Sequence, residues 1–416
     1  MLTRHIIITS LDIGSTNTTA VIAGVDGHGQ VELLGHGCCP TVGYSDDTIT
    51  DVMELGAMIG RCVGAAEEMA EMNSGSLVAS VGGEHVRIMQ GRGGIPLHQA
   101  GDGHKGVLVN RQDLKKALEN AGTIPLPSAL QSIHVLPLVY YVDGQKVKDP
   151  VGLSGTRIDV DVMIVAAKQS FLRSVMKAAE TGGYRIRKFC YRPLATSRAV
   201  LSEDEMDQGA CMFDIGGRHT DVALFKDGRL LSTSTLMLGG EDFTADTIVH
   251  LEVNRDEAEN IKFRYGNCET ENCDQGEFQI ARPTSDGSLW KSVRRKDLGR
   301  VVMQPRAEEI LEESMFALGL GSAANIMPVC GVLTGGGSKL AGLRGLAIKM
   351  LPFPVIADEL IGVDTLEGTA PGAEHATALG LALFDMEQRL NRREEVKDNP
   401  VSRMFNRVLK KIHTVM

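Results

Sequence analysis

The feature that most constrains this chain is a short pattern that occurs twice, at 11–23 and at 211–225. Each copy has a β-type apolar run, then Asp-Ile-Gly, then a second β-type run, which predicts a hairpin with a carboxylate and backbone N–H groups at its tip. The corresponding positions in the two copies are Asp12 and Asp214, Gly14 and Gly216, and Thr18 and Thr220. The chain is therefore expected to have two related halves that face each other across a nucleotide.

A nucleoside triphosphate needs hydrogen-bond donors at its phosphates and a cation to neutralise them. The two hairpins can supply the donors, and Asp12 and Asp214 are expected to hold a hydrated Mg²⁺, which keeps several waters. A third glycine-rich break follows an apolar strand at 329–334, and glycine lets a flat ligand lie against the backbone. The candidate nucleotide-binding residues are Gly14, Ser15, Thr16, Asn17, Gly216, Gly217, Arg218, Glu259, Lys262, Gly335, Gly336 and Gly337.

Glu259 and Lys262 are the candidates for contact with the ribose hydroxyls and the base. They stand one helical turn apart, so a plain surface ion pair is the alternative interpretation.

Length and composition exclude several classes of protein. With 416 residues the chain is expected to form roughly two to four units of typical size. A net charge of −10 argues against a nucleic-acid partner, because no basic face is available for the phosphate backbone. The eight cysteines are scattered, which indicates reduced cytosolic thiols that are mostly core residues. Cys268 and Cys273 could contribute to a metal site, but an ordinary polar loop is favoured because two further ligands lack recognisable spacing.

Apolar periodicity predicts an α/β chain. Strands are expected over 6–23, 31–35 and 77–83, and helices over 51–72, 169–181 and 256–266. The uncharged stretch 314–338 is interrupted by glycines and a proline, so it predicts a helix end, a turn and a strand rather than a membrane span. The N-terminus starts a strand and lacks the apolar core of a signal peptide, so no export is expected.

The end of the chain has a different character. A charged linker at 391–400 ends in proline, and 401–416 then places apolar residues on one side of a helix and basic residues toward the other. Such a helix, ~24 Å long, is expected to lie in a membrane interface, with packing on the protein body as the alternative. The residues expected to contact anionic lipids are Met404, Phe405, Arg407, Val408, Leu409, Lys410, Lys411 and Ile412.

With these residues in view, the sequence resembles the FtsA family of bacterial cell-division proteins, which belongs to the actin, Hsp70 and sugar-kinase ATPase superfamily. The superfamily signal consists of the two Asp-Ile-Gly hairpins, the segment 259–262 and the segment 333–337. More specific to FtsA are the segments 134–144 and 149–155, which lie in a module inserted in the first half.

The resemblance implies an α/β, actin-like two-lobed ATPase fold with an FtsA-type inserted subdomain in the first half. It implies ATP and Mg²⁺ binding, self-assembly into an actin-like filament, tethering of the FtsZ ring to the cytoplasmic face of the inner membrane at the division septum, and recruitment of later divisome membrane proteins. By analogy, 241–300 would face FtsZ. Hydrolysis is expected to be slow or absent, because no general base can be nominated.

Two alternatives remain within the same superfamily. A pilus-assembly ATPase also carries an FtsA-like module, although the basic amphipathic tail argues against it. A small-molecule kinase would need a catalytic carboxylate in a substrate motif, and none is evident.

The resemblance also implies how the chain is divided. The expected parts are lobe 1 at 1–82 and 165–206, the inserted subdomain at 83–164, the lobe 2 core at 207–240 and 301–371, the small subdomain of lobe 2 at 241–300, a return helix to lobe 1 at 372–390, the linker at 391–400 and the membrane-targeting helix at 401–416.

The chain departs from the family at Arg218, where a third glycine is usual. The side chain is expected either to obstruct close approach of the backbone to the phosphates or to replace a lost N–H contact with its guanidinium. Binding would be retained and turnover altered.

Overall fold

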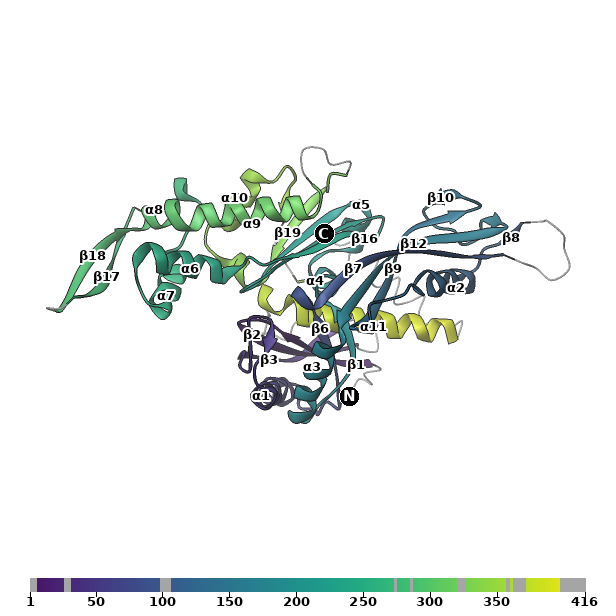
Figure 1. Ribbon diagram of the computed structural model, residues 1–416, viewed down its shortest axis with the longest axis horizontal. Coiled ribbons are helices and arrows are strands. Elements are labelled where there is room, and N and C mark those ends of the chain that lie inside the picture. Colours follow the sequence, from purple (N-terminus) through teal and green to yellow (C-terminus); the bar gives the residue numbers. More distant parts are fainter. Residues whose placement is uncertain are drawn as a thin grey trace.

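The computed structural model describes residues 6–25, 31–97, 106–272, 275–284, 287–320, 326–356, 360–361 and 372–396. The membrane helix expected at 401–416 therefore lies outside the described residues. Figure 1 shows an elongated molecule with a layered α/β centre and two arms that extend to opposite sides.

The first half is built on a five-stranded sheet. Its strands, in sheet order, are β13 (Arg185–Tyr191), β6 (Ser76–Val81), β1 (Ile6–Ile13), β2 (Asn17–Val25) and β3 (Val31–Pro40). The last three form an antiparallel meander, whereas β6 and β13 run parallel to β1. The predicted strands of this half are confirmed.

The second half repeats the same arrangement. Its strands, in the corresponding order, are β20 (Val355–Ile356), β19 (Cys330–Thr334), β14 (Ala210–Ile215), β15 (Thr220–Lys226) and β16 (Arg229–Leu236). Here too a three-stranded meander is followed by parallel strands. The two copies of the Asp-Ile-Gly pattern occupy the same hairpin in each sheet, which confirms the prediction of two related halves.

The helices stack with the two sheets into layers. Helices α1 (Val52–Ala70) and α3 (Gln169–Thr181) cover the outer face of the first sheet. Helices α4 (Arg192–Val200) and α11 (Ala376–Val396) share one apolar core with the facing sides of both sheets. The outer face of the second sheet packs against helices of its own half, namely α6 (Gly240–Leu251), α7 (Arg255–Tyr265), α9 (Gln304–Ala317) and α10 (Leu343–Met350).

Local signals explain the bounds of α1. The Asp51 carboxylate accepts hydrogen bonds from the N–H groups of Met53 (2.8 Å) and Glu54 (3.0 Å), which satisfies two donors that have no partner within the helix. The helix ends where Glu71 adopts a left-handed conformation with φ 52°. The helix predicted over 51–72 is thus confirmed.

Helix α11 is longer than expected. It begins after a single 3₁₀ turn, Ala373–His375, and continues to Val396, six residues beyond the predicted end of the return helix. The residues at 392–395 are Arg-Arg-Glu-Glu, which are good helix formers, and the first strong breaker is Pro400. The first part of the segment predicted as a linker is therefore helical.

One arm is the module inserted in the first half, with a sheet and an apolar core of its own. Helix α2 (Arg111–Ala121) packs on this sheet. The strands of the arm are β7 (Val86–Pro96), β8 (Val107–Leu108), β9 (Leu130–Val142), β10 (Gln145–Val147), β11 (Ser154–Gly155) and β12 (Arg157–Lys168).

The other arm is a two-stranded hairpin of β17 (Glu277–Thr284) and β18 (Gly287–Arg294), followed by α8 (Arg295–Leu298). Figure 1 shows the hairpin projecting from the second half. Phe278 and Ile280 join the core of that half, while Trp290 is 65% exposed. A projecting hairpin has little apolar surface to bury, which accounts for the polar composition of 277–294, the part of 267–297 that it spans.

Two further expectations concern a membrane-spanning helix and the cysteines at 268 and 273. Among the described helices, none combines the length and the apolar character that are needed to cross a bilayer. Cys268 is buried in the core of the second half, where burial raises the pKa of its thiol to about 12. Cys273 lies outside the described residues.

Candidate functional site

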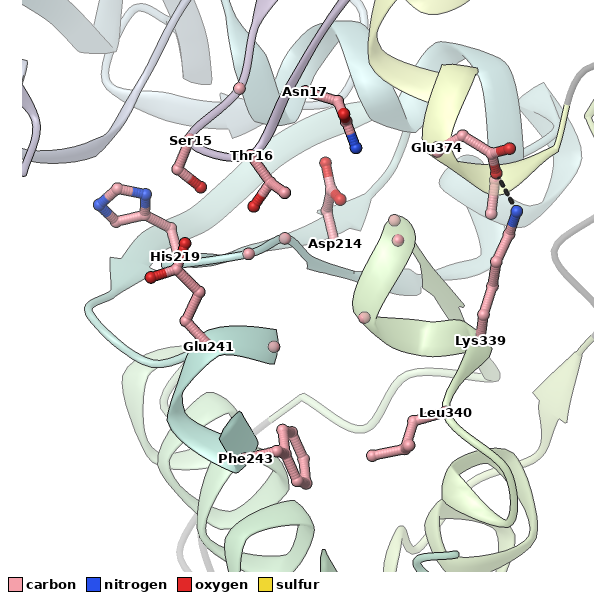
Figure 2. Close-up of a pocket in the computed structure, with 18 of the residues that line it drawn as sticks. Ser15, Thr16, Asn17, Asp214, His219, Glu241, Phe243, Lys339, Leu340 and Glu374 are labelled. Carbon is pink, nitrogen blue, oxygen red and sulfur yellow. Dashed lines mark ion pairs between the residues drawn. The ribbon is translucent and has the colours of Figure 1, made fainter. Parts of the chain in front are cut away.

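A cavity of about 600 Å³ lies between the two Asp-Ile-Gly hairpins (Figure 2). This volume is in the range of small-molecule sites. The structure brings together all of the predicted nucleotide and metal residues in its lining except Arg218. They are Asp12, Gly14, Ser15, Thr16, Asn17, Asp214, Gly216, Gly217, Glu259, Lys262, Gly335, Gly336 and Gly337.

The two hairpins have the same turn. The Gly14 N–H donates to the Asn17 carbonyl at 3.1 Å, and the Gly216 N–H donates to the His219 carbonyl at 2.8 Å. Equivalent residues therefore occupy equivalent places on the two sides of the cavity, and Figure 2 shows the side chains of Ser15 and Thr16 directed toward the second hairpin.

Helix α6 fixes the orientation of the second hairpin. The carbonyls of Gly216 and Gly217 accept hydrogen bonds from the N–H groups of Gly240 (2.9 Å) and Glu241 (2.7 Å), in the first turn of α6. Because each peptide unit is planar and trans, the N–H groups of Gly217 and Arg218 point the opposite way. The Arg218 N–H accordingly donates to the Ser15 hydroxyl at 3.2 Å, so this row of donors faces the first hairpin.

Close approach to neighbouring atoms requires glycine at several lining positions, of which Gly217 and Gly335 are the clearest. A Cβ atom at Gly217 would lie 2.2 Å from Thr16 Oγ1, across the cavity. Gly335 has φ +84°, and a Cβ atom there would lie 2.3 Å from an Asp214 carboxylate oxygen. Side chains at either position would fill space beside the hairpin tips.

The two predicted metal carboxylates have different surroundings. Asp214 is buried and accepts hydrogen bonds from the hydroxyls of Thr196 (3.0 Å) and Thr377 (3.3 Å). Burial, and secondly the charge of Asp221, raises the pKa of Asp214 to about 7. Asp12 accepts a hydrogen bond from Ser80 and lies 3.4 Å from Arg192 Nε.

Sequence reasoning missed Arg192, which joins the two halves. Its Nη2 donates to the carbonyl of Ile13 at 3.2 Å, and its Nη1 lies 3.5 Å from Asp221. Pro193 marks the start of a helix after a strand, so a charged side chain at a strand-to-helix junction was an available signal. Asp221 was detectable as a charge within an apolar strand.

A second missed feature is an ion pair at the edge of the cavity. Lys339, in the 3₁₀ turn Gly336–Lys339, pairs with Glu374, in the turn before α11 (Figure 2). Both side chains line the cavity. Lys339 stands two residues after the triple glycine, but nothing near it in the sequence points to Glu374, so only the fold reveals their proximity.

Glu259 and Lys262 do not form a plain surface pair. Lys262 is 7% exposed, and its ammonium lies 2.8 Å from Glu259, 2.9 Å from the Thr244 hydroxyl and 3.0 Å from the Gly240 carbonyl. These contacts engage the donors of the ammonium within the protein and hold the Glu259 carboxylate at the cavity.

The far end of the cavity is apolar. Figure 2 shows Phe243 and Leu340 facing each other there, away from the first hairpin. The cavity therefore offers backbone donors and carboxylates at one end and a surface suited to a flat ring at the other.

The side chain of Arg218 lies elsewhere. Its guanidinium pairs with Asp46 at 2.6 Å and with Glu241 at 3.7 Å. It is not part of the cavity lining, so it neither fills the space between the hairpins nor stands in for an N–H donor there.

Two matching sheets that share a cavity at their hairpins define an actin-like ATPase fold, as predicted. Solved structures of this shape include the PilM–PilN type IV pilus biogenesis complex, with a TM-score of 0.63 and 20% identity over 91% of this chain and 98% of that chain. MreB5 of Spiroplasma citri bound to ADP gives a TM-score of 0.55 and 13% identity over 94% of this chain and 99% of that chain.

Sequence comparison identifies the family. The family model "Cell division protein FtsA" matches residues 211–380, and the model "SHS2 domain inserted in FTSA" matches 83–166. The cell division protein FtsA of Neisseria meningitidis serogroup B is 30% identical, covering 90% of this chain and 89% of its own length. FtsA of Escherichia coli K12 is 27% identical, covering 94% of this chain and 93% of its own length. The chain belongs to the FtsA family of cell division proteins, which confirms the resemblance.

Proposed function

We propose that the chain binds ATP with Mg²⁺ in the cavity between its two halves, and that it works in cell division as a filament-forming membrane tether for the FtsZ ring. The observation that carries the nucleotide part is the pair of equivalent hairpins on opposite sides of one cavity. Similarity to an ADP-bound MreB5 in fold supports the same choice of ligand.

The residues fit such a ligand from end to end. The N–H groups at the hairpin tips would donate to phosphate oxygens, and Asp12 and Asp214 would hold a hydrated Mg²⁺. The Glu259 carboxylate, fixed by Lys262, would accept from ribose hydroxyls. The bound cation would neutralise phosphate charge, while the apolar end of the cavity would receive the base.

The tether function rests on family membership and on the sequence of the C-terminal segment. The segment 401–416 has an apolar side and a basic side, the pattern of a helix that lies on an anionic membrane. We further propose that 241–300 faces FtsZ, that the inserted module contributes to filament contacts and to recruitment of later division proteins, and that the chain acts at the cytoplasmic face of the septal membrane.

Sedimentation with liposomes tests the tether. The full chain and a chain truncated after Pro400 are mixed with anionic phosphatidylglycerol vesicles, with and without ATP, Mg²⁺ and purified FtsZ. The full chain is expected to pellet and to carry FtsZ down, whereas the truncated chain does neither. If both chains stay in the supernatant, membrane tethering is wrong.

Two neighbouring substitutions sharpen the test. Phe405→Glu places a charge on the apolar side of the expected helix, and Asn406→Glu places the same charge toward the polar side. Phe405→Glu is expected to abolish pelleting. Asn406→Glu should weaken it only by about 1 kcal/mol, the effect of one charge near an anionic surface. Equal loss in both variants would indicate attraction by charge alone rather than insertion of an apolar face.

A further inference from the structure

A small hairpin of the first half reaches the second phosphate hairpin. It consists of β4 (Tyr44–Ser45) and β5 (Thr48–Ile49), and its turn residues Asp46 and Asp47 have φ of 48° and 54°. These left-handed conformations make a tight turn that carries two adjacent carboxylates. Both carboxylates contact residues of the other half.

Asp47 makes a buried contact with the second half. One carboxylate oxygen lies 2.7 Å from His219 Nε2, and the other accepts the Tyr44 hydroxyl at 3.0 Å. An ionised carboxylate can only accept, so His219 Nε2 carries the proton. Asp47 is 5% exposed and His219 is 7% exposed, so this bond is shielded from water.

Asp46 makes the companion contact nearer the surface. Its carboxylate lies 2.6 Å from a guanidinium nitrogen of Arg218, whose other end faces Glu241 in α6. Arg218 and His219 directly follow Gly216 and Gly217 in the chain. The two acids of one turn thus hold the two residues that follow Gly216 and Gly217.

The position of the turn gives these bonds their significance. The β4–β5 hairpin lies between β3 and α1 in the first half, while Arg218 and His219 lie between β14 and β15 in the second. Separation of the halves must break both contacts, and it would also remove a nucleotide held between the two hairpins from its contacts with one of them. The Asp47 bond is the more costly to break, because it is buried and charge-assisted.

We propose that Asp46 and Asp47 are positioning residues that hold the second phosphate hairpin against the first half, and so set the lifetime of the bound nucleotide. The proposal rests on nucleotide binding in the cavity. It gives Arg218 a role at the junction of the halves instead of at the phosphates.

Release of fluorescently labelled ADP from the full chain tests this proposal. The protein is loaded with labelled ADP and Mg²⁺ and mixed rapidly with excess unlabelled ADP. Asp47→Ala is expected to release ADP about tenfold faster, as loss of a buried charge-assisted bond predicts. Asp46→Asn and Arg218→Gln should each release it roughly twofold to fivefold faster, as for an exposed ion pair.

A double variant and a control variant make the result specific to the contacts of Asp46 and Asp47. Asp46→Asn and Arg218→Gln combined should be no faster than Arg218→Gln alone, because both substitutions remove the same contact between the halves. Glu54→Gln, an exposed acid of the same half, removes the same charge and should release ADP at the wild-type rate. Melting temperatures without nucleotide separate release from unfolding, and Asp46→Asn guards against failure of Asp47→Ala to fold.

The outcomes separate this inference from the proposed function. If the wild-type chain binds no labelled ADP, nucleotide binding is wrong and the positioning role falls with it. If the wild type binds ADP but Asp46→Asn and Asp47→Ala release it at the wild-type rate, only the positioning role is overturned.

Discussion

At the scale of residues, Gly335 and Gly336 are neighbours with different tolerances. A side chain at Gly335 meets Asp214 and needs a left-handed backbone, whereas a Cβ atom at Gly336 has nothing within 4 Å. Gly335→Ala should therefore lower the free energy of unfolding by roughly 1–3 kcal/mol, and Gly336→Ala should leave it nearly unchanged. Urea unfolding of both variants without nucleotide measures these free energies. Equal midpoints for the two variants would contradict the prediction that, of the two, only Gly335 requires glycine.

Residue patterns predicted the part of the site that is local in the chain. The Asp-Ile-Gly hairpins and the triple glycine carry their geometry in a few consecutive residues, because glycines and strand runs define a turn by themselves. The partners of Arg192 and Glu374 became visible only in the fold, since they are remote in sequence. For the same reason, the partner of Arg218 could not be inferred, as nothing near position 218 points to Asp46.

At the scale of elements, His134 on β9 ties the inserted module to the first sheet. Its Nε2 accepts the backbone N–H of Tyr191 in β13 at 3.0 Å. Burial, with a smaller effect from Lys188, lowers the pKa of His134 to about 3. The ring is therefore neutral in the folded chain at neutral pH.

This depressed pKa predicts a pH dependence with a definite sign. Between pH 3 and 6.5 the unfolded chain binds a proton that the folded chain does not, so stability from this residue falls as pH falls below about 6.5. At pH 5 the loss is about 2 kcal/mol. Asp214, with a raised pKa, acts in the opposite direction, so the wild type alone does not isolate the effect.

His134→Gln is the comparison that isolates it. Glutamine can still accept the Tyr191 N–H but does not titrate. From pH 7 to pH 5, the wild type should lose about 2 kcal/mol more of its free energy of unfolding than the variant. If the wild type and the variant lose the same free energy of unfolding between pH 7 and pH 5 in urea unfolding, protonation of His134 does not cause the loss.

Element lengths show where periodicity was insufficient. The apolar pattern located α1 closely, and the capping residue Asp51, directly before the helix, marks where it begins. The end of α11 was placed too early, because its charged last turns were interpreted as a linker. Helix propensity, rather than amphipathic pattern, accounts for the continuation of the helix past residue 390.

At the scale of the whole molecule, the repeated hairpin motif predicted the two matching halves, but not how the inserted module meets the second half. That contact comes from β16, where Arg229 Nη1 donates to the Leu138 carbonyl at 3.3 Å and the guanidinium lies over the Tyr140 ring at 4.9 Å. Lys148 adds ion pairs to Asp207 (2.9 Å) and Asp227 (3.0 Å). The module thus branches from one half and rests on the other.

Arg229→Ala should therefore loosen the module without touching the cavity, which Arg229 does not line. Loss of its hydrogen bonds to the Leu138 and Lys148 carbonyls and of its ring contact, together about 1.5–2.5 kcal/mol, should speed hydrogen exchange of amides in 138–148 by roughly tenfold or more. Arg173→Ala, which removes an exposed arginine that bonds only within α3 among the contacts described, serves as the control and should leave this segment unchanged. Unchanged exchange in Arg229→Ala would mean that Arg229 does not hold the module against the second half.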